Sequence, residues 1–565
     1  MSQEAFEVVQ WARSKGASIP SQIDFVRDES KGICTVCKED LQGVKIRIPS
    51  SIIIGRKDAR GIFAPRYDGD NTGLKFLLSF WKSENNVEFG PYLRNLPSQL
   101  DSALIWSPDE WQLLRGTNLG NSIKEKLSTI YSEWTTWIKD RGLSNDSLDF
   151  DEFDDQQLYQ DFLKPASRGQ FSSWSSFSAF LWSHLILLSR AFPEYIIDPH
   201  CHEGSVILLP LLDLLNHSAH SKVQWYSEEG AFCLEQNDGI TKGQELFNNY
   251  GAKGNEELLA GYGFVQEDNE FDYVALKIKL PLKTIENILE NEPRIKLPTL
   301  DDYTTFAFEK STDKKKDKAD ASYFENGIRF FINTQNENCL NPLLDLFSYL
   351  SKTDVTENWT DLRPRLQGLQ SLRAALKLKQ DQASILPDEL KPSAAIHPYR
   401  QYCAGIYRQG QLRVLKHAIT SLKQLEKDLF TQHKHQLLNL KKILKDDARF
   451  VDEELPNLFQ DKDQDEVSFD DTFELLVLWI LAKLKNDSFQ EKHEWIRKQF
   501  KVSINKEQTI TEEAELLYSH FFSEQQTTTT KITLEELNDA YNFVLNNSFT
   551  RSASSSSETI LVQSA

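Results

Sequence analysis

Long apolar stretches are absent from this 565-residue chain. The longest is the eight-residue run Leu475–Ala482, far short of the ~20 apolar residues that a membrane-spanning helix needs. The first 17 residues carry acidic side chains and lack the apolar core of a secretory signal. We therefore expect a soluble cytoplasmic protein, with the nucleus as a further compartment, and no contact with a membrane.

Cysteine is sparse, with six residues scattered along the chain. Cys34 and Cys37 form a C-x-x-C pair, the spacing of half a metal or redox site. No second pair and no close histidine follow to complete the four ligands of a zinc site. The pattern favours free thiols in a reducing compartment, and we expect no bound metal.

A basic excess is missing as well, because the formal net charge is −20. Proteins that bind nucleic acid usually carry a basic footprint, so we expect no direct nucleic-acid binding. The acidic balance either attracts a basic protein partner through long-range steering or serves solubility. The sequence leaves both interpretations open.

The distribution of apolar residues predicts how the chain is organised. Short strand patterns occupy residues 22–54 and 203–265, and helical spacing fills the stretch from about 70 to 192. From about residue 275 the pattern is mostly helical again. Two strand blocks that flank a helical segment are expected to close into one unit around it.

Four parts follow from these patterns. They are an N-terminal helix at 1–21, a strand-rich unit at 22–265 with a helical insertion at about 61–190, a helical unit at 266–550, and a serine-rich tail at 551–565 that we expect to be disordered.

The residues best suited to chemistry lie between 209 and 264. This segment combines Asp213, Asn216, His217, Tyr250 and Tyr262 with several glycines, a composition that suits backbone brought close to a ligand. Taken singly, the histidine is more often a hydrogen-bonded structural residue, and each tyrosine is more often a core aromatic. Their order in the chain is more informative than any one of them.

Together these residues resemble a known family. The motifs D-L-x-N-H-S from Asp213, E-L-F-x-x-Y-G ending at Gly251 and G-Y-G-F ending at Phe264 resemble the SET-domain lysine methyltransferases. The resemblance is closest to the fungal ribosomal-protein lysine methyltransferases and the plant Rubisco large-subunit methyltransferase. Further segments agree in order: Ser30-Lys31-Gly32 at the family's G-x-G turn, Pro91-Tyr92-Leu93, Ser189-Arg190-Ala191-Phe192 and the helical stretch 410–429.

The resemblance implies an α+β fold. Small SET-domain sheets would surround a pseudo-knot, with a helical insertion, and an all-α substrate-binding domain would follow. It also implies an S-adenosylmethionine-dependent protein-lysine N-methyltransferase whose partner is a basic ribosomal protein of the large subunit. A translation elongation factor as substrate, or a catalytically silent SET scaffold, are the alternatives.

The resemblance also assigns roles to residues. Tyr250 would be the catalytic tyrosine, and Ser189, Arg190 and Asp213 would contact the substrate lysine. The S-adenosyl-L-methionine site would comprise Ser30, Lys31, Gly32, Arg190, Asn216, His217, Tyr250 and Tyr262. One departure is Ser30, which stands where the family has its first glycine. If that position requires a positive φ, serine there costs on the order of 1 kcal/mol and could loosen cofactor binding.

Overall fold

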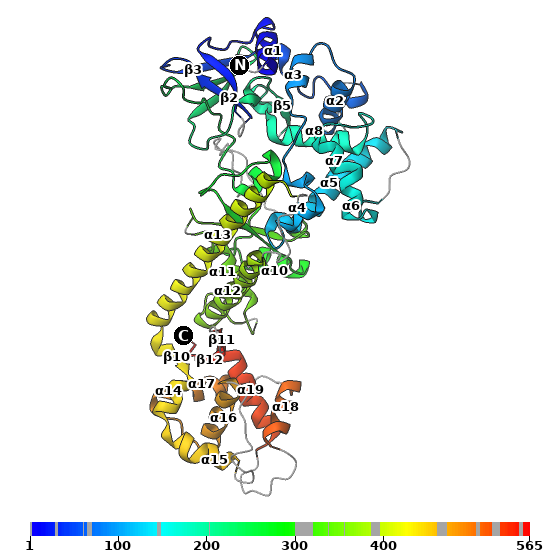
Figure 1. Ribbon diagram of the computed structural model, residues 1–565. Coiled ribbons are helices and arrows are strands. Elements are labelled where there is room, and N and C mark those ends of the chain that lie inside the picture. Colours follow the sequence, from blue (N-terminus) through cyan, green and yellow to red (C-terminus); the bar gives the residue numbers. More distant parts are fainter. Residues whose placement is uncertain are drawn as a thin grey trace.

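A computed structural model describes most of the chain. The described residues are 3–28, 32–59, 61–64, 70–143, 149–202, 204–299, 320–336, 338–354, 356–385, 396–459, 472–503, 509–522, 532–552 and 557–564. They form an elongated molecule in which small antiparallel sheets alternate with many helices (Figure 1). The α+β fold class is therefore confirmed. No helix in these ranges combines the length and apolarity needed to cross a bilayer.

Small antiparallel sheets build the N-terminal end. After α1 (Gln3–Ser14), β1 (Ile23–Asp28) pairs with β2 (Gly32–Cys37). β3 (Val44–Ile48) pairs with β7 (Ala231–Gln236), which also pairs with β6 (Val223–Glu228). Buried residues alternate with polar ones along β3, as they should in a half-buried strand. Because β3 and β7 are neighbours, residues from both sides of the helical segment share one sheet.

The helical segment between these strands packs around aromatic residues. Ser176 caps α8 by accepting a hydrogen bond from the backbone N–H of Ala179. Phe76 stacks on Trp137 with ring centroids 3.9 Å apart, and Phe180 of α8 lies 4.7 Å from Phe76. The helices are α2 (Thr72–Ser83), α3 (Gly90–Asn95), α4 (Pro108–Gln112), α5 (Asn118–Asp140), α6 (Asp155–Leu158), α7 (Lys164–Ser167) and α8 (Phe177–Arg190).

A threaded crossing follows α8. His217 and Asn248 form a parallel bridge, in which the Asn248 N–H donates to the Asn216 carbonyl at 2.8 Å. The Leu246 N–H donates to the Thr35 carbonyl of β2 at 2.6 Å. The segment that leads to Tyr250 thus lies between β2 and the loop of Asn216, which is the arrangement that the resemblance implies.

In the described part of the next unit, most elements are helices, and β8 (Tyr273–Ile278) pairs antiparallel with β9 (Ile328–Asn333), which follows it after α10. Its longest helix, α13, runs from beside the N-terminal unit to the start of the C-terminal helices (Figure 1). The buried Arg408 of α13 donates to the carbonyls of Leu113 and Arg115, which fixes the helix to the insertion. The helices are α10 (Leu282–Asn291), α11 (Asn341–Leu350), α12 (Leu362–Ser384) and α13 (Pro398–Gln432).

The C-terminal helices enclose a separate hydrophobic core. Its centre is α16, the most apolar run of the sequence, whose residues from Leu476 to Ala482 are all buried. The helices of this unit are α14 (Leu440–Asp446), α15 (Leu455–Leu458), α16 (Thr472–Lys485), α17 (Glu494–Ser503), α18 (Glu512–Phe521) and α19 (Leu534–Asn547).

The tail at 551–565 differs from our expectation of disorder. β11 (Ser548–Ser552) and β12 (Ser557–Val562) form a hairpin, and β12 also pairs with β10 (Leu437–Asn439). The serine-rich composition led to that expectation, but the segment also contains Ile560, Leu561 and Val562. Their side chains are buried against the C-terminal helices and α12. Residues 553–556 and 565 lie outside the described part of the chain.

Leu561→Ala is expected to lower the free energy of unfolding by about 3 kcal/mol, because a fully buried leucine leaves a cavity when it is shortened. Leu545→Ala, which shortens a leucine that is 47% exposed, should change it by less than about 0.5 kcal/mol. Urea titration of both variants gives the comparison. Equal stabilities would mean that β12 does not pack as described.

Candidate active site

A cavity of about 390 Å³ opens where the helical insertion meets the threaded crossing. Its volume is within the range of ordinary small-molecule sites. Its walls come from the N-terminal part of α2, the C-terminal half of α8, the strands β4 (Ala191–Pro193), β5 (Val206–Leu208) and β6, and the segment from 248 to 262. The lining residues are Asn71, Lys75, His184, Leu187, Leu188, Ser189, Arg190, Ala191, Phe192, Pro193, Val206, Asp213, Trp225, Asn248, Tyr250, Lys253 and Tyr262.

Tyr250 is held on both faces and at its hydroxyl. Its ring stacks between His217, at a centroid distance of 4.9 Å, and Tyr262, at 5.0 Å. Its hydroxyl donates to the Leu215 carbonyl at 2.6 Å. Burial raises the pKa of this hydroxyl, so the group stays protonated at neutral pH. Since its proton is committed to Leu215, the oxygen keeps lone pairs for an incoming N–H donor.

Asn216 and His217 brace the crossing. The Asn216 amide donates to the Ile33 carbonyl of β2 at 3.1 Å and to the Glu245 carboxylate at 2.7 Å. The Tyr250 N–H donates to Nδ1 of His217 at 3.1 Å, so a neutral ring carries its proton on Nε2. Burial and the charge of Lys253 lower the pKa of His217 to about 4.

The lowered pKa of His217 predicts that the folded chain loses stability at acidic pH. An unfolded histidine titrates near 6.5. The stability that neutral His217 contributes is therefore present above pH 6.5 and is lost as the pH falls toward 4. At pH 5 the loss is about 2 kcal/mol by proton linkage.

His217→Asn keeps an acceptor near the Nδ1 position but does not titrate. Unfolding in urea at pH 7.5 and pH 5 is expected to show a pH-dependent drop about 2 kcal/mol smaller in His217→Asn than in the wild type. Other titrating groups are common to both proteins and cancel. Equal drops would contradict the lowered pKa.

Arg190, Asp213 and Tyr92 form a buried polar cluster beside the tyrosines. Arg190 donates to the backbone carbonyl of Asp213 at 2.7 Å and to its carboxylate at 3.3 Å. The Tyr92 hydroxyl donates to the same carboxylate oxygen at 3.0 Å. Burial raises the pKa of the Asp213 carboxyl, and the Arg190 guanidinium opposes that rise. The Asp213 side chain is fully buried, so its charge depends on these two donors.

The remaining predicted residues are placed as follows. Ser189 and Tyr262 line the cavity, although the Ser189 hydroxyl donates back to the Leu185 carbonyl at 2.8 Å within α8. Gly32 begins β2 with φ of +78°, a conformation that glycine adopts without strain. Ser30 and Lys31 lie outside the described residues, so their predicted contacts with the cofactor stay predictions.

The structure adds residues to the cavity that the sequence analysis did not single out. Lys75 and His184 face it from α2 and α8, Trp225 from β6, and Asn248 and Lys253 from the segment around Tyr250. Lys253 follows Tyr250 by three residues, so proximity along the chain was a usable signal. The others depend on how α2, α8 and β6 meet, which no local pattern reveals. Across the described ranges, no group of three His, Cys, Asp or Glu side chains is placed to hold a metal ion.

Buried polar atoms at the site test whether a ligand fits. The described atoms at the site that have no hydrogen-bond partner include Asp213 Oδ1, Asn248 Nδ2, His184 Nδ1 and His217 Nε2. Three of them belong to residues that line the cavity: Asp213 offers an acceptor, Asn248 a donor and His184 a ring nitrogen. Buried polar groups are usually paired, so this set suits a ligand that carries both amino and acceptor groups.

Comparisons with known proteins agree with this geometry. Residues 294–433 match the family model described as the EFM1 middle domain. The chain is 44% identical over 591 residues to "Ribosomal lysine N-methyltransferase 1" of Saccharomyces cerevisiae, covering all of both chains. It is 26% identical over 526 residues to "Protein-lysine N-methyltransferase EFM1" of the same yeast, covering 87% of this chain and 85% of that relative.

Solved structures agree on the fold. The structure titled "Structure of Rubisco LSMT bound to AdoMet" superposes with a TM-score of 0.53 at 18% identity, covering 81% of this chain and all of that one. A second, titled as the SET domain of LSMT bound to lysine and AdoHcy, also gives a TM-score of 0.53. Given the full-length identity to the yeast enzyme and the crossing around Tyr250, the chain belongs to the SET-domain protein-lysine methyltransferases.

Proposed function

We propose that this chain transfers a methyl group from S-adenosylmethionine to a lysine of a ribosomal protein of the large subunit. The observation that carries the proposal is the Tyr250 hydroxyl, protonated and fixed to Leu215, in a cavity that Arg190 and Asp213 also line. The yeast relative at 44% identity is named a ribosomal lysine N-methyltransferase, which supports the choice of substrate. Such a substrate favours a cytoplasmic site of action, with the nucleus as a further one.

The reacting lysine must be neutral. The ordinary pKa of a lysine amine is near 10.4, so only about one amine in 10³ is neutral at cellular pH, a handicap of roughly 4 kcal/mol. When bound, the cofactor supplies a sulfonium methyl group, and its positive charge lowers the pKa of the amine. The walls of the cavity lower that pKa further by desolvation, so the chain needs no strong general base. Its task is to align the amine and to exclude water.

We propose particular atoms for that task, and the described contacts support the choice. The Tyr250 oxygen accepts an N–H of the lysine amine and so directs the nitrogen lone pair toward the methyl group. Asp213 Oδ1 offers a second acceptor at the cavity wall. Arg190 holds the Asp213 carboxylate in place, and its planar fork suits a carboxylate of the cofactor. Asn216 and His217 fix the crossing on which the cofactor would lie.

The domain boundaries belong to the same proposal. Residues 22–265 would form the SET domain, with the helical insertion at about 61–190 inside it. Residues 266–550 would help to select the protein substrate. The acidic net charge suits a basic ribosomal protein as the partner, and we propose no direct contact with nucleic acid.

Transfer of labelled methyl groups tests the function. The purified chain is incubated with labelled S-adenosylmethionine and with ribosomes or cytosolic extract from cells that lack this gene. A labelled large-subunit ribosomal protein is expected. Label in an elongation factor would support protein-lysine methyl transfer but would show that the substrate is not a ribosomal protein. No label, although the chain is folded and binds the cofactor, would favour the silent scaffold.

A further inference from the structure

One side chain closes the loop that carries Tyr262. Asn255 begins α9 (Asn255–Glu257), and the π-helical turn Leu258–Tyr262 follows it. The Asn255 amide donates to the Gln266 carbonyl at 2.9 Å and accepts from the Gln266 N–H at 2.8 Å. The side chain is only 1% exposed, so these bonds are shielded from water. The loop from 255 to 266 is thus clamped at both ends by a single amide.

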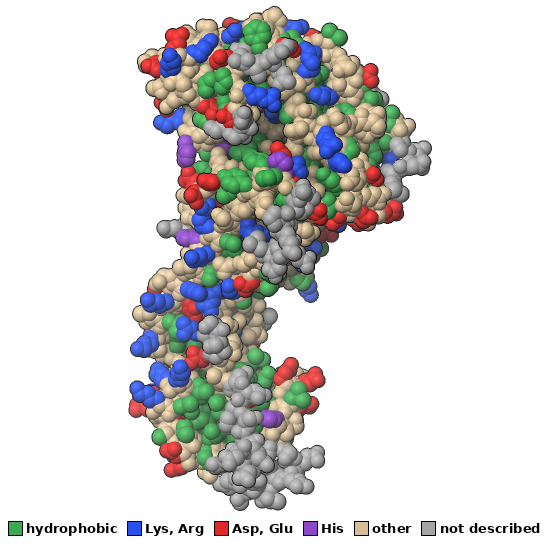
Figure 2. Space-filling model, viewed as in Figure 1, with side chains coloured by type: hydrophobic (Ala, Val, Ile, Leu, Met, Phe, Trp, Pro, Cys, Tyr) green, Lys and Arg blue, Asp and Glu red, His purple; other side chains and the backbone are tan. Residues whose placement is uncertain are grey.

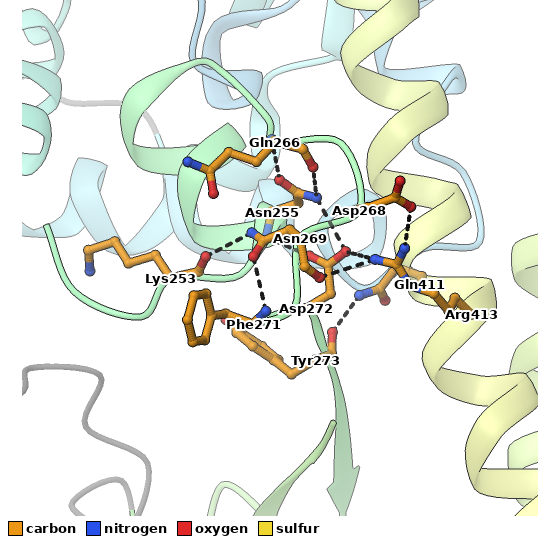
Figure 3. A network of polar contacts seen from close by, with 10 residues as sticks. All are labelled: Lys253, Asn255, Gln266, Asp268, Asn269, Phe271, Asp272, Tyr273, Gln411 and Arg413. Carbon is orange, nitrogen blue, oxygen red and sulfur yellow. Dashed lines mark hydrogen bonds and ion pairs between the residues drawn. The ribbon is translucent and has the colours of Figure 1, made fainter. Parts of the chain in front are cut away.

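A buried carboxylate and an arginine hold this clamp (Figure 3). Asp272 accepts the backbone N–H of Asn255 at 2.8 Å and its amide at 3.2 Å. Arg413 reaches in from α13, bonding the Asp272 carboxylate at 3.3 Å, the Asn269 carbonyl at 3.1 Å and the Asp268 carboxylate at 2.8 Å. Burial raises the pKa of the Asp272 carboxyl, and Arg413 is the cation that opposes the rise.

The fit between α13 and this loop is close. Residue 410 is glycine, and a Cβ there would lie 2.0 Å from an Asp272 carboxylate oxygen. One residue further along, the Gln411 amide donates to the Tyr273 carbonyl at 2.6 Å (Figure 3). The missing side chain at Gly410 therefore lets α13 pack directly against Asp272, and hydrogen bonds hold the two together. A shift of α13 would displace Asp272 as well.

The same network reaches the cavity. The Asn269 amide donates to the Lys253 carbonyl at 2.9 Å (Figure 3). Lys253 lines the cavity, pairs with Glu257 at 3.7 Å and lies 6.0 Å above the Tyr262 ring. Lys253 and Tyr262 are here called the Tyr262 wall. Both members of this wall are tied to α13 through the clamp.

We propose that Arg413 is a positioning residue for methyl transfer, acting through Asp272 and Asn255 on the Tyr262 wall. Its effect on rate rests on the proposed function. The Arg413 side chain is 42% exposed, but the Asp272 carboxylate is only 5% exposed, so loss of Arg413 is expected to cost some global stability. The cost is limited because the backbone N–H and amide of Asn255 still donate to Asp272. Catalytic geometry is far more sensitive, because displacements below 1 Å already slow an aligned reaction. Loss of Arg413 should therefore slow catalysis more than it destabilises the fold.

The chain offers a matched control. Arg551 is also 42% exposed and pairs with a buried carboxylate, that of Glu426, but it lies in β11 beside α12 and α13, away from the cavity. Arg413→Met and Arg551→Met each remove one such pair and keep the aliphatic stem. Arg413→Lys keeps a charge that can reach Asp272.

Two measurements test the proposal. With ribosomes from cells lacking the gene, Arg413→Met should lower kcat about tenfold, with the KM for S-adenosylmethionine within twofold of the wild type. Arg413→Lys should recover most of the rate, and Arg551→Met should retain it. Amide hydrogen exchange over residues 253–266 should be faster in Arg413→Met, while its Tm falls no further than that of Arg551→Met.

Unchanged exchange in Arg413→Met, or an equal loss of rate in Arg551→Met, would overturn the proposal. If the wild-type chain labels no ribosomal protein, the proposed function is contradicted, but the proposed role of Arg413 in positioning the loop is not. The exchange measurement needs no substrate, so it would then still decide whether Arg413 holds the Tyr262 wall. On the face that Figure 2 shows, Lys and Arg side chains are interspersed with Asp and Glu side chains.

Discussion

Tyr250→Phe is expected to lower kcat for methyl transfer about 100-fold while the chain stays folded. Phenylalanine keeps the ring that stacks between His217 and Tyr262. It loses the hydroxyl that donates to Leu215, and with it the oxygen proposed to receive the lysine amine. One lost hydrogen bond costs about 1 kcal/mol of stability, too little to unfold a domain. The rate loss should therefore far exceed the loss of stability.

Tyr518→Phe is a matched control for this variant. The Tyr518 hydroxyl also donates to a backbone carbonyl, that of Ile532 at 3.0 Å, but it lies in the C-terminal core. Both variants should lose similar stability in urea titration, and only Tyr250→Phe should lose methyl transfer to ribosomes. If Tyr250→Phe has the kcat of the wild type, the Tyr250 hydroxyl has no role in methyl transfer.

Local patterns account for the helices and for the order of the motifs. α8 could be predicted from its apolar spacing, and its C-terminal residues Ser189 and Arg190 do line the cavity. The Asn216-His217 pair and Tyr250 were recognisable as parts of a family motif. Their contacts come from the threaded crossing, which joins Asn216 to Ile33 across 183 residues. Neither periodicity nor propensity contains information on pairing at that separation.

Other features were hidden for different physical reasons. β12 follows a run of serines, which predicts disorder. The strand forms because Ile560 and Leu561 are buried against α12 and the C-terminal helices, and this packing is not visible in the local sequence. The Arg413–Asp272 contact depends on Gly410, which lets α13 approach a loop about 140 residues away in sequence. A glycine within a long helix lowers helix propensity by about 1 kcal/mol. Gly405 of the same helix has nothing within 4 Å of the position of a Cβ, so a helical glycine alone predicts neither a close contact nor its partner.

Arg190→Met is expected to destabilise the chain by about 3 kcal/mol and to abolish measurable methyl transfer. It leaves the fully buried Asp213 carboxylate with Tyr92 as its one remaining side-chain donor among the described residues. A buried charge without its partner is strongly destabilising. The carboxyl is expected to take up a proton, since loss of the cation raises its pKa further.

The sign of the pH dependence follows from that shift. A carboxyl whose pKa is higher in the folded chain than in the unfolded chain favours the folded state at low pH. This advantage is lost as the pH rises through the folded pKa. The stability deficit of Arg190→Met relative to the wild type should therefore be larger at pH 7.5 than at pH 5. A deficit that does not change with pH would show that Asp213 is not the group left uncompensated.

Asp213→Asn in the Arg190→Met background separates stability from catalysis. The amide carries no charge and can still accept the Tyr92 hydroxyl, so the double variant should recover most of the lost stability at pH 7.5. It should not recover methyl transfer, because the guanidinium that holds the cavity wall is still missing. Arg363→Met removes a buried arginine from its pair with Glu357 in the helical unit and should cost stability without abolishing the rate. If the double variant recovers methyl transfer, the Arg190 guanidinium is not needed for catalysis. Its role would then be structural: it would only compensate the charge of Asp213.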